Sequence, residues 1–281
     1  MMDDLKTKKV AFLGGGSIAR SLIAGLIKSH LIAPSNIYVT DHKESTVQNL
    51  RDKYGLHASL SMEDWATQAD IIVFCVKPKD IVAALEQVRS NIKHDVLFVS
   101  VVAGCSLDFL LDHIHTLASG QRQAIRFIRA MPNTSSAVMH SATAYALSQG
   151  CNEHDEAMVK LIFDAVGLSF KVEESLLDAV TGLSGSGPAY VYYLVEAMTE
   201  AGIRVGLPSS LAEQLATQTL FGAAMLLHQS ENTASQLRQQ VTSKGGTTMA
   251  GLAALDDHGF KDAIVAAVEH ATNRAKEMGL K

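Results

Sequence analysis

The stretch VAFLGGGSIA, residues 10–19, decides the fold of this chain. Its four leading apolar residues predict a short buried strand, and the apolar residues of Ile18–Ser29 recur with helical spacing. The glycine turn between them fits G-x-G-x-x-G/A, with Gly14, Gly16 and Ala19 at the fixed positions. A strand, a glycine turn and a helix in this order predict a loop that binds a dinucleotide pyrophosphate at a helix N-terminus. The loop residues predicted to bind the coenzyme are Gly14, Gly16, Ser17, Ile18 and Ala19.

Further apolar runs follow at intervals that leave room for helices. These runs cover residues 37–39, 71–76, 96–102 and 124–130. Unbroken apolar runs are typical of strands that are buried on both faces. The alternation predicts an α/β fold, with a parallel, doubly wound sheet covered by helices on both faces.

The pattern changes near residues 170–173, after which only helices are predicted. They cover residues 175–181, 189–202, 211–229, 233–241, 248–255 and 261–277. We therefore expect a dinucleotide-binding domain at 1–171 and an all-helical domain at 172–281. Residues 188–197 are apolar around most of the helix circumference, and a helix of this kind must be buried. A domain this small has little interior, so the expected partner is a second copy of the chain.

Composition excludes several classes of protein. The 281 residues carry a net charge of −5, and without a basic excess no nucleic-acid partner is expected. Cys75, Cys105 and Cys151 form no CxxC pair, which argues against a disulfide framework or a metal site and favours a reducing cytoplasm. No apolar run approaches the roughly 20 residues that span a bilayer, so no membrane partner is expected.

The strand ends supply the other predicted coenzyme contacts. Asp41 follows the second strand and could accept a hydrogen bond from a ribose hydroxyl, which would favour NAD. His42 and Lys43 could instead hold a 2′-phosphate and favour NADP, and the residues leave this choice even. The remaining predicted contacts lie at or just after the end of a later strand; they are Val76, Lys77, Pro78, Ala103 and Asn133. For Asn133, a contact to the nicotinamide and a role as a turn former are equally open.

A second glycine turn lies in VTSKGGTTM, residues 241–249. Gly245 and Gly246 precede a predicted helix start, where free N–H groups without side chains in the way form an anion site. A carboxylate is the natural ligand, and the hydroxyls of Ser243 and Thr248 would add hydrogen bonds. The alternative is an ordinary N-cap, which would explain Thr247 alone.

No obvious proton donor accompanies these two turns. Nicotinamide enzymes that act on alcohols usually carry a His, Lys or Tyr that moves the hydroxyl proton. The segment LSGSGPAY, residues 183–190, contains no Lys or His, and Tyr190 begins an apolar helix where a packing role is favoured. This absence favours a C=N substrate, whose nitrogen is already basic.

Three segments resemble the signature regions of the Δ1-pyrroline-5-carboxylate reductase family. They are LSGSGPAY at 183–190, AGIRVGLP at 201–208 and VTSKGGTTMAGL at 241–252, and GGGSIA, VKP and AMPNT precede them in the family's order. The resemblance covers nearly the whole chain. It implies reduction of a cyclic imine to L-proline by NAD(P)H, usually NADPH, and a Rossmann domain followed by a helical domain that forms an intertwined homodimer, often stacked into larger rings such as a decamer.

The resemblance also implies roles for individual residues. Thr248 matches the threonine that hydrogen-bonds the imine nitrogen. Ser243 and the backbone of Gly245, Gly246 and Thr247 match the carboxylate cradle. Two departures stand out: Lys244 replaces a usual proline, and residues 135–140 lack the proline and glycines common after AMPNT.

Two other functions fit the sequence less well. A hydroxyacid dehydrogenase of similar build would need a lysine on the helix at 188–197, which has none. A non-catalytic NADP sensor would not need the carboxylate cradle.

Overall fold

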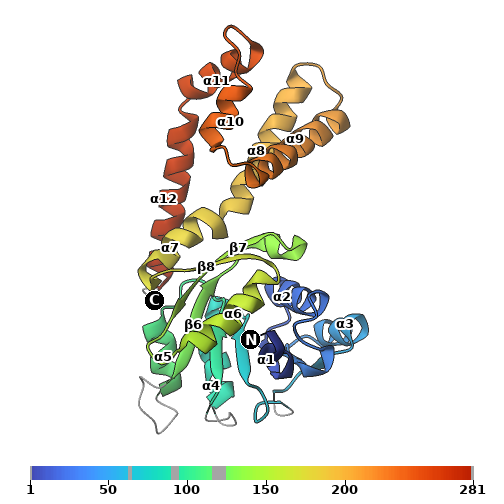
Figure 1. Ribbon diagram of the computed structural model, residues 1–281, viewed down its shortest axis with the longest axis vertical. Helices are drawn as coiled ribbons and strands as arrows, with labels where there is room; N and C mark the ends of the chain where they lie inside the picture. The colour runs from blue at the N-terminus through green and yellow to red at the C-terminus, as the bar shows by residue number, and fades with distance from the viewer. Residues whose placement is uncertain (1, 63–64, 90–94, 116–124, 280–281) are drawn as a thin grey trace. The chain divides into compact units, whose positions relative to one another are not determined.

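The computed structural model describes residues 2–62, 65–89, 95–115 and 125–279. The chain forms two compact units (Figure 1). Unit 1 comprises the described residues up to Ser186 together with those from His270 onward, and unit 2 is Gly187–Glu269.

Unit 1 is built on an eight-stranded sheet with the order β3-β2-β1-β4-β5-β6-β7-β8. Neighbouring strands are parallel except for the antiparallel pair of β6 and β7. The strands are β1 (Val10–Leu13), β2 (Ile37–Thr40), β3 (His57–Ser59), β4 (Ile71–Phe74), β5 (Leu97–Ser100), β6 (Arg126–Met131), β7 (Ser141–Leu147) and β8 (Gly167–Lys171).

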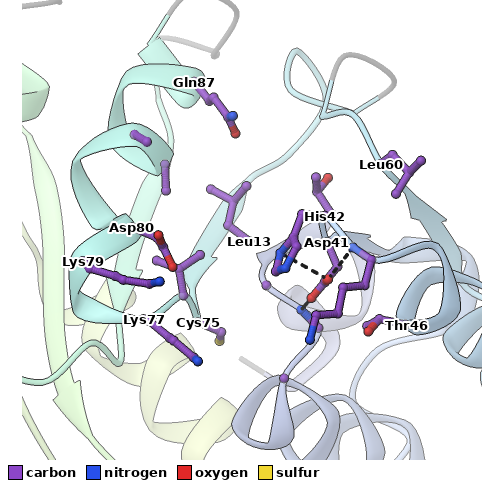
Figure 2. Close-up of a pocket in the computed structure, with 18 of the residues that line it drawn as sticks. Leu13, Asp41, His42, Thr46, Leu60, Cys75, Lys77, Lys79, Asp80 and Gln87 are labelled. Carbon is purple, nitrogen blue, oxygen red and sulfur yellow. Dashed lines mark hydrogen bonds and ion pairs between the residues drawn. The ribbon is translucent and has the colours of Figure 1, made fainter.

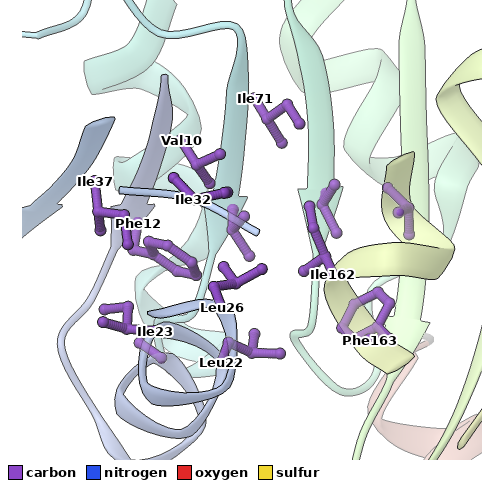
Figure 3. Packing of buried hydrophobic residues seen from close by; sticks show 14 of the residues in the cluster. Val10, Phe12, Leu22, Ile23, Leu26, Ile32, Ile37, Ile71, Ile162 and Phe163 are labelled. Atoms are coloured by element: carbon purple, nitrogen blue, oxygen red, sulfur yellow. The ribbon is translucent and has the colours of Figure 1, made fainter. Parts of the chain in front are cut away.

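Helices cover both faces of this sheet. They are α1 (Met2–Thr7), α2 (Ser17–Lys28), α3 (Glu44–Tyr54), α4 (Ile81–Arg89), α5 (Leu107–His115), α6 (Glu153–Asp164) and α7 (Leu177–Val180). Successive residues of β1 alternate between two cores: Val10 and Phe12 pack with α2, α3 and α6, whereas Ala11 and Leu13 pack with α4 and α5. Figure 3 shows the first of these cores, with Phe12 beside side chains of α2. The predicted doubly wound α/β fold is confirmed.

The predicted strands need several corrections at their ends. The run at 71–76 is a strand only to Phe74, the run at 96–102 only over Leu97–Ser100, and the run at 124–130 is Arg126–Met131. Residue 124 lies outside the described residues. The apolar letters continue into turns beyond the strands, so hydrophobicity alone overestimates strand length.

The expectation of a wholly parallel sheet was wrong at one position. The segment SATAYAL, residues 141–147, forms β7 and pairs antiparallel with β6. The apolar pattern of the sequence does not predict β7, β8 or the short β3. These segments mix small, polar and charged residues, so they lack the continuous apolar runs by which the other strands were recognised. The predicted helix at 175–181 is a 3-10 turn (Glu174–Leu176), then α7, then a π-helical turn (Thr181–Gly185).

Unit 2 is helical throughout. It contains α8 (Gly187–Arg204), α9 (Ser209–Gln229), α10 (Ala234–Gln240), α11 (Thr247–Asp257) and the first half of α12 (Phe260–Gly279). Helices α8 and α9 approach closely, because a Cβ on Gly202 would lie 2.9 Å from the Cβ of Ala212. Yet α8, which the structure describes throughout, buries none of its residues, and α9 buries only Ala212 and Ala216.

The compact units begin and end at different residues from the predicted domains 1–171 and 172–281. Leu177 of α7 is fully buried in the core of unit 1, so the sheet domain retains this short helix. The end of α12 also belongs to unit 1, where Gly104 lies against Met278.

Candidate active site

A pocket of about 590 Å³ opens at the carboxyl ends of β1, β2 and β4 (Figure 2). Strands β1 and β4 are neighbours in the sheet, although β2 and β3 separate them in the chain. This is where the strand order reverses, and open α/β sheets bind their ligands in the crevice at such a point.

The glycine turn at the pocket floor has the geometry of a phosphate-binding loop. Gly14 has φ +95°, and a Cβ there would lie 2.7 Å from the Cys75 carbonyl oxygen. Its N–H donates to the Thr40 carbonyl at 2.8 Å, which fixes the turn to β2. A Cβ on Gly16, in contrast, would meet nothing within 4 Å. The turn therefore presses against the sheet at Gly14 and stays open to a ligand at Gly16.

The first turn of α2 follows directly. Ser17 and Ile18 begin the helix, and the fully buried Ala19 allows the helix to approach the sheet closely. The N-cap residue is Gly16, which has no side chain to accept from the helix, so the first N–H groups of α2 remain available to an anion. These features fit a dinucleotide pyrophosphate.

The pocket is lined by more cationic than anionic side chains. Its cations are Arg20, Lys43, Lys77 and Lys79, and its carboxylates are Asp41 and Asp80. The Arg20 Nε donates to the Gly15 carbonyl at 2.8 Å, which holds this guanidinium beside the loop. A protein with a net charge of −5 thus concentrates positive charge at one site, as binding of a multiply charged anion requires.

The predicted coenzyme residues are partly brought together here. Gly14, Gly16, Asp41, Lys43, Val76 and Lys77 all line the pocket. Pro78 begins the 3-10 turn after Lys77, whereas Ala103 and Asn133 are not among the lining residues. Their contact with a coenzyme stays a prediction.

Asn133 makes several hydrogen bonds within unit 1. Its side-chain oxygen accepts from Ser135 N at 3.1 Å, and its Nδ2 donates to the Ser184 carbonyl at 3.0 Å. Its own N–H donates to Ser141 Oγ at 3.2 Å. Asn133 therefore connects the AMPNT loop to the π-helical turn of the LSGSGP segment, and these bonds support its role as a turn former.

Cys75 also lines the pocket, beneath the glycine turn. Burial raises the pKa of its thiol. The thiol is therefore neutral at physiological pH and is not poised as a nucleophile.

The second glycine turn, before α11, has a different construction. Gly245 has φ +73°, which favours glycine, and a Cβ on Gly246 would overlap the hydroxyl of Ser243. The Gly246 N–H donates to the Ser243 carbonyl at 3.1 Å, and Gly246 caps α11 without a side-chain hydrogen bond. The first N–H groups of α11 are consequently left for an external acceptor, with the exposed Thr248 in the same turn.

Tyr190, the one acid candidate in the LSGSGPAY segment, is held within unit 2. Its hydroxyl donates to the Ala267 carbonyl at 3.4 Å and its side chain is half-buried. This contact favours a packing role. Among the described residues, no group of three His, Cys, Asp or Glu side chains could hold a metal ion. No helix of the described chain is long and apolar enough to cross a membrane.

Comparison with known proteins gives consistent matches along the chain. Residues 174–278 match the family model described as pyrroline-5-carboxylate reductase dimerisation, and residues 9–104 match one described as NADP oxidoreductase coenzyme F420-dependent. Pyrroline-5-carboxylate reductase of Arabidopsis thaliana is 37% identical over 96% of this chain and 95% of its own length. Pyrroline-5-carboxylate reductase 2 of Bacillus subtilis is 38% identical, with the same coverage. The chain belongs to the pyrroline-5-carboxylate reductase family.

Solved structures of this family have the same fold. The reductase from Coxiella burnetii is 33% identical and superposes with a TM-score of 0.87, covering 97% of this chain and 98% of its own. The Plasmodium falciparum pyrroline carboxylate reductase, solved with NADP bound, is 28% identical and superposes with a TM-score of 0.83, covering 98% of this chain and 99% of its own. The predicted Rossmann-like domain with a helical dimerisation domain, and the predicted family, are confirmed.

Several residues that line the pocket are not predicted as coenzyme contacts by the sequence motifs. The principal ones are Gly15, Arg20, Lys79 and Asp80. Arg20 stands one turn into α2, close enough to the loop to suggest a phosphate contact. Lys79 and Asp80 follow Pro78 in a 3-10 turn, whose path the sequence does not indicate.

Proposed function

We propose that this chain reduces the cyclic imine Δ1-pyrroline-5-carboxylate to L-proline, with NADPH as the preferred coenzyme and NADH as a weaker one. The observation that carries the proposal is the turn before α11. Gly245 adopts a positive φ, and Gly246, which carries no Cβ, leaves room for the Ser243 hydroxyl beside the uncapped start of α11. Such a turn suits a carboxylate, which the substrate carries.

The residues of unit 1 hold the coenzyme. Gly14, Gly16 and the first turn of α2 bind the pyrophosphate, and the cationic side chains of the pocket balance its charge. NADP bound to the P. falciparum relative supports this assignment. When bound, the reduced coenzyme supplies the hydride that the C=N carbon accepts.

The residues of unit 2 hold the substrate. Ser243 and the backbone N–H groups of Gly245 and Thr247 bind the carboxylate, and the Thr248 hydroxyl orients the imine nitrogen. Gly246 shapes the turn instead, because its own N–H donates to the Ser243 carbonyl at 3.1 Å. A protonated imine already carries the proton that a ketone would have to receive, so positioning supplies most of the acceleration. No protein acid is then required, which accords with the engaged Tyr190.

The helical part of the chain forms the dimer in this proposal. Residues 172–281 supply the self-association, and the dimers stack into a decamer. Large apolar side chains of unit 2 support this, since Tyr193 is 74% exposed and Val205 is 82% exposed in the single chain. Light scattering should give a mass of at least two chains, and a mass near 30.1 kDa would contradict it. The cytoplasmic location expected from the cysteines stays a prediction.

Measurement of NADPH oxidation with and without pyrroline-5-carboxylate tests the reaction, with NADH as a second coenzyme. We expect oxidation only in the presence of the imine and no turnover of 2-hydroxy acids. Coenzyme binding without turnover of any cyclic imine would contradict the proposal and favour a sensor.

The variant Thr248→Ala tests the role of the hydroxyl. We expect kcat/KM to fall by a factor of about 10 to 10³, because an orienting hydrogen bond in the transition state is lost, while coenzyme affinity stays unchanged. Thr248→Ser should recover most of the activity. Thr247→Ala is the matched control, because only the backbone of Thr247 has a role. Full activity in Thr248→Ala would remove Thr248 from the mechanism.

A further inference from the structure

Asp41 occupies the position where an acidic residue commonly selects NAD. A carboxylate at the end of the second strand accepts hydrogen bonds from the ribose hydroxyls in many dinucleotide-binding proteins. Here, however, both carboxylate oxygens have backbone partners (Figure 2). Oδ2 accepts from Gly15 N at 2.8 Å, and Oδ1 accepts from Lys43 N at 2.9 Å.

These two bonds join separate parts of the pocket. Gly15 belongs to the turn between β1 and α2, whereas Lys43 is the N-cap of α3. The backbone N–H of Asp41 itself donates at 3.3 Å to the carbonyl of Ser59, the last residue of β3. Asp41 therefore links three strand ends, and its side chain is only 10% exposed.

Gly15 lets the phosphate loop pack directly against α3. A Cβ on Gly15 would lie 2.7 Å from Thr46 Cγ2 and 2.9 Å from Leu50 Cδ1, both on α3. The phosphate loop consequently rests directly against α3, with the Asp41 carboxylate bridging the two. A charged oxygen that accepts backbone N–H groups makes a strong hydrogen bond, so removal of the charge should loosen the loop.

Two side chains that can donate hydrogen bonds, those of His42 and Lys43, stand beside Asp41. Lys43 is exposed, and its ammonium has no hydrogen bond or ion pair with any described residue. The His42 ring lies 3.6 Å from Asp41 Oδ1 and is 84% exposed. A 2′-phosphate finds the Lys43 ammonium at this position, whereas ribose hydroxyls find a carboxylate that is only 10% exposed and already accepts a backbone N–H on each oxygen.

We infer that Asp41 is a positioning residue, which braces the phosphate loop for either coenzyme, and that Lys43 selects the coenzyme that carries a 2′-phosphate. The inference deepens the proposed function by assigning coenzyme selection within it. It reverses the usual reading of an acidic residue at this position.

Equilibrium binding tests both halves without the imine. The dissociation constants of NADPH and NADH are measured by coenzyme fluorescence, together with the melting temperature of the coenzyme-free protein. For Lys43→Met we expect the NADPH constant to rise about 10- to 50-fold, as for loss of a charge-assisted bond, with the NADH constant changed less than twofold. Lys53→Met, also exposed and on α3 but outside the pocket, is the control and should change neither constant.

Asp41→Asn separates the brace from a ribose ligand. A brace predicts that both constants rise by a similar factor, about 10-fold, and that the melting temperature of the coenzyme-free protein falls. A ribose ligand predicts that NADH binding alone weakens and that the melting temperature is unchanged. That second result, or an unchanged NADPH constant in Lys43→Met, overturns the inference.

A ligand comparison on the unaltered protein avoids any dependence on the folding of a variant. Adenosine 2′,5′-bisphosphate should displace NADPH from the unaltered protein at a concentration at least tenfold lower than 5′-AMP. Equal displacement by the two nucleotides would contradict selection by Lys43. These binding measurements contain no imine, so a negative result does not contradict the proposed reduction. Conversely, an absence of imine turnover would not change the binding result.

Discussion

The turns before α2 and α11 both place glycines ahead of a helix N-terminus, but they are held in different ways. In the first, Gly14 and Gly15 bond to Thr40 and Asp41, more than twenty residues away in the sequence. In the second, the Gly246 N–H reaches only as far as Ser243. The first turn is thus fixed by the sheet, whereas the second is fixed by its own local bonds.

This difference indicates how the two turns recognise their ligands. Long-range bonds preorganise the phosphate loop, so little entropy remains to be lost when a pyrophosphate binds. The turn before α11 is exposed, and the helices around it bury few residues within the chain. Segments with few buried contacts open at low free-energy cost, so this turn should gain order when its ligand or a second subunit binds.

The largest expected effect comes from Gly14→Ala in the sheet-held turn. The new Cβ would lie 2.7 Å from the Cys75 carbonyl oxygen at a φ of +95°. Steric overlap and backbone strain together should cost about 2–4 kcal/mol in the free energy of unfolding, and NADPH affinity should fall more than about 100-fold. Urea unfolding and fluorescence titration measure the two quantities.

Gly16→Ala is the matched control for that prediction. Its Cβ would meet nothing within 4 Å and its φ of −70° is ordinary, so the free energy of unfolding should stay the same. Coenzyme affinity should still fall, because the methyl group lies on the side open to the pyrophosphate. Wild-type stability in Gly14→Ala would show that the turn is not held by the sheet.

An intermediate effect is expected from Gly245→Ala in the locally held turn. No atom lies within 4 Å of the new Cβ, so only the φ of +73° opposes it, at a cost of about 1–2 kcal/mol. The turn should relax and misplace its N–H groups. We expect the KM for pyrroline-5-carboxylate to rise about 10-fold, while the NADPH dissociation constant is unchanged.

Gly251→Ala, in the helix that follows this turn, is the matched control. It lies inside α11, has no positive φ and no atom near its Cβ, so helix propensity alone should make it neutral or slightly stabilising. If Gly245→Ala leaves the KM unchanged, the turn does not hold the substrate carboxylate.

The sequence revealed these two turns for the same physical reason. Other residues rarely replace glycine at a positive φ or beside a ligand, so Gly14 and Gly245 mark the two turns in the sequence itself. Continuous apolar runs likewise indicated β1, β4 and β5. In contrast, β7 consists largely of small residues such as Ala142 and Ala144, and its pairing with β6 and β8 stabilises it as a strand.

The orientation of polar side chains could not be read from the sequence. Asp41 has the same letter whether its oxygens face a ribose or the backbone of Gly15, and only the position of α3 decides between them. Arg20 and Lys79 join the pocket because of where their helical turns lie, which depends on packing over long range. The sequence therefore predicts local structure where the backbone conformation requires a particular residue. It does not predict which partners a polar side chain contacts.

The smallest expected effect lies at the opposite end of α2 from the phosphate loop. His30 follows the C-cap Ser29 with a φ of 55°, and its side chain is exposed. A left-handed conformation costs a non-glycine residue about 1–2 kcal/mol, of which the greater freedom of glycine in the unfolded chain cancels up to about 1 kcal/mol. His30→Gly should therefore stabilise unit 1 by about 0.5–1 kcal/mol.

This gain in stability should not change ligand affinity if the phosphate loop is held by its own long-range hydrogen bonds. We expect a melting temperature higher by about 1–4 °C, with unchanged NADPH affinity and unchanged KM for the imine. His30→Asn should give a smaller gain, since asparagine tolerates this conformation better than histidine, and His30→Val should destabilise. Tighter coenzyme binding in His30→Gly would mean that the loop moves with the whole of α2, because stabilising the far end of the helix would then order the loop as well.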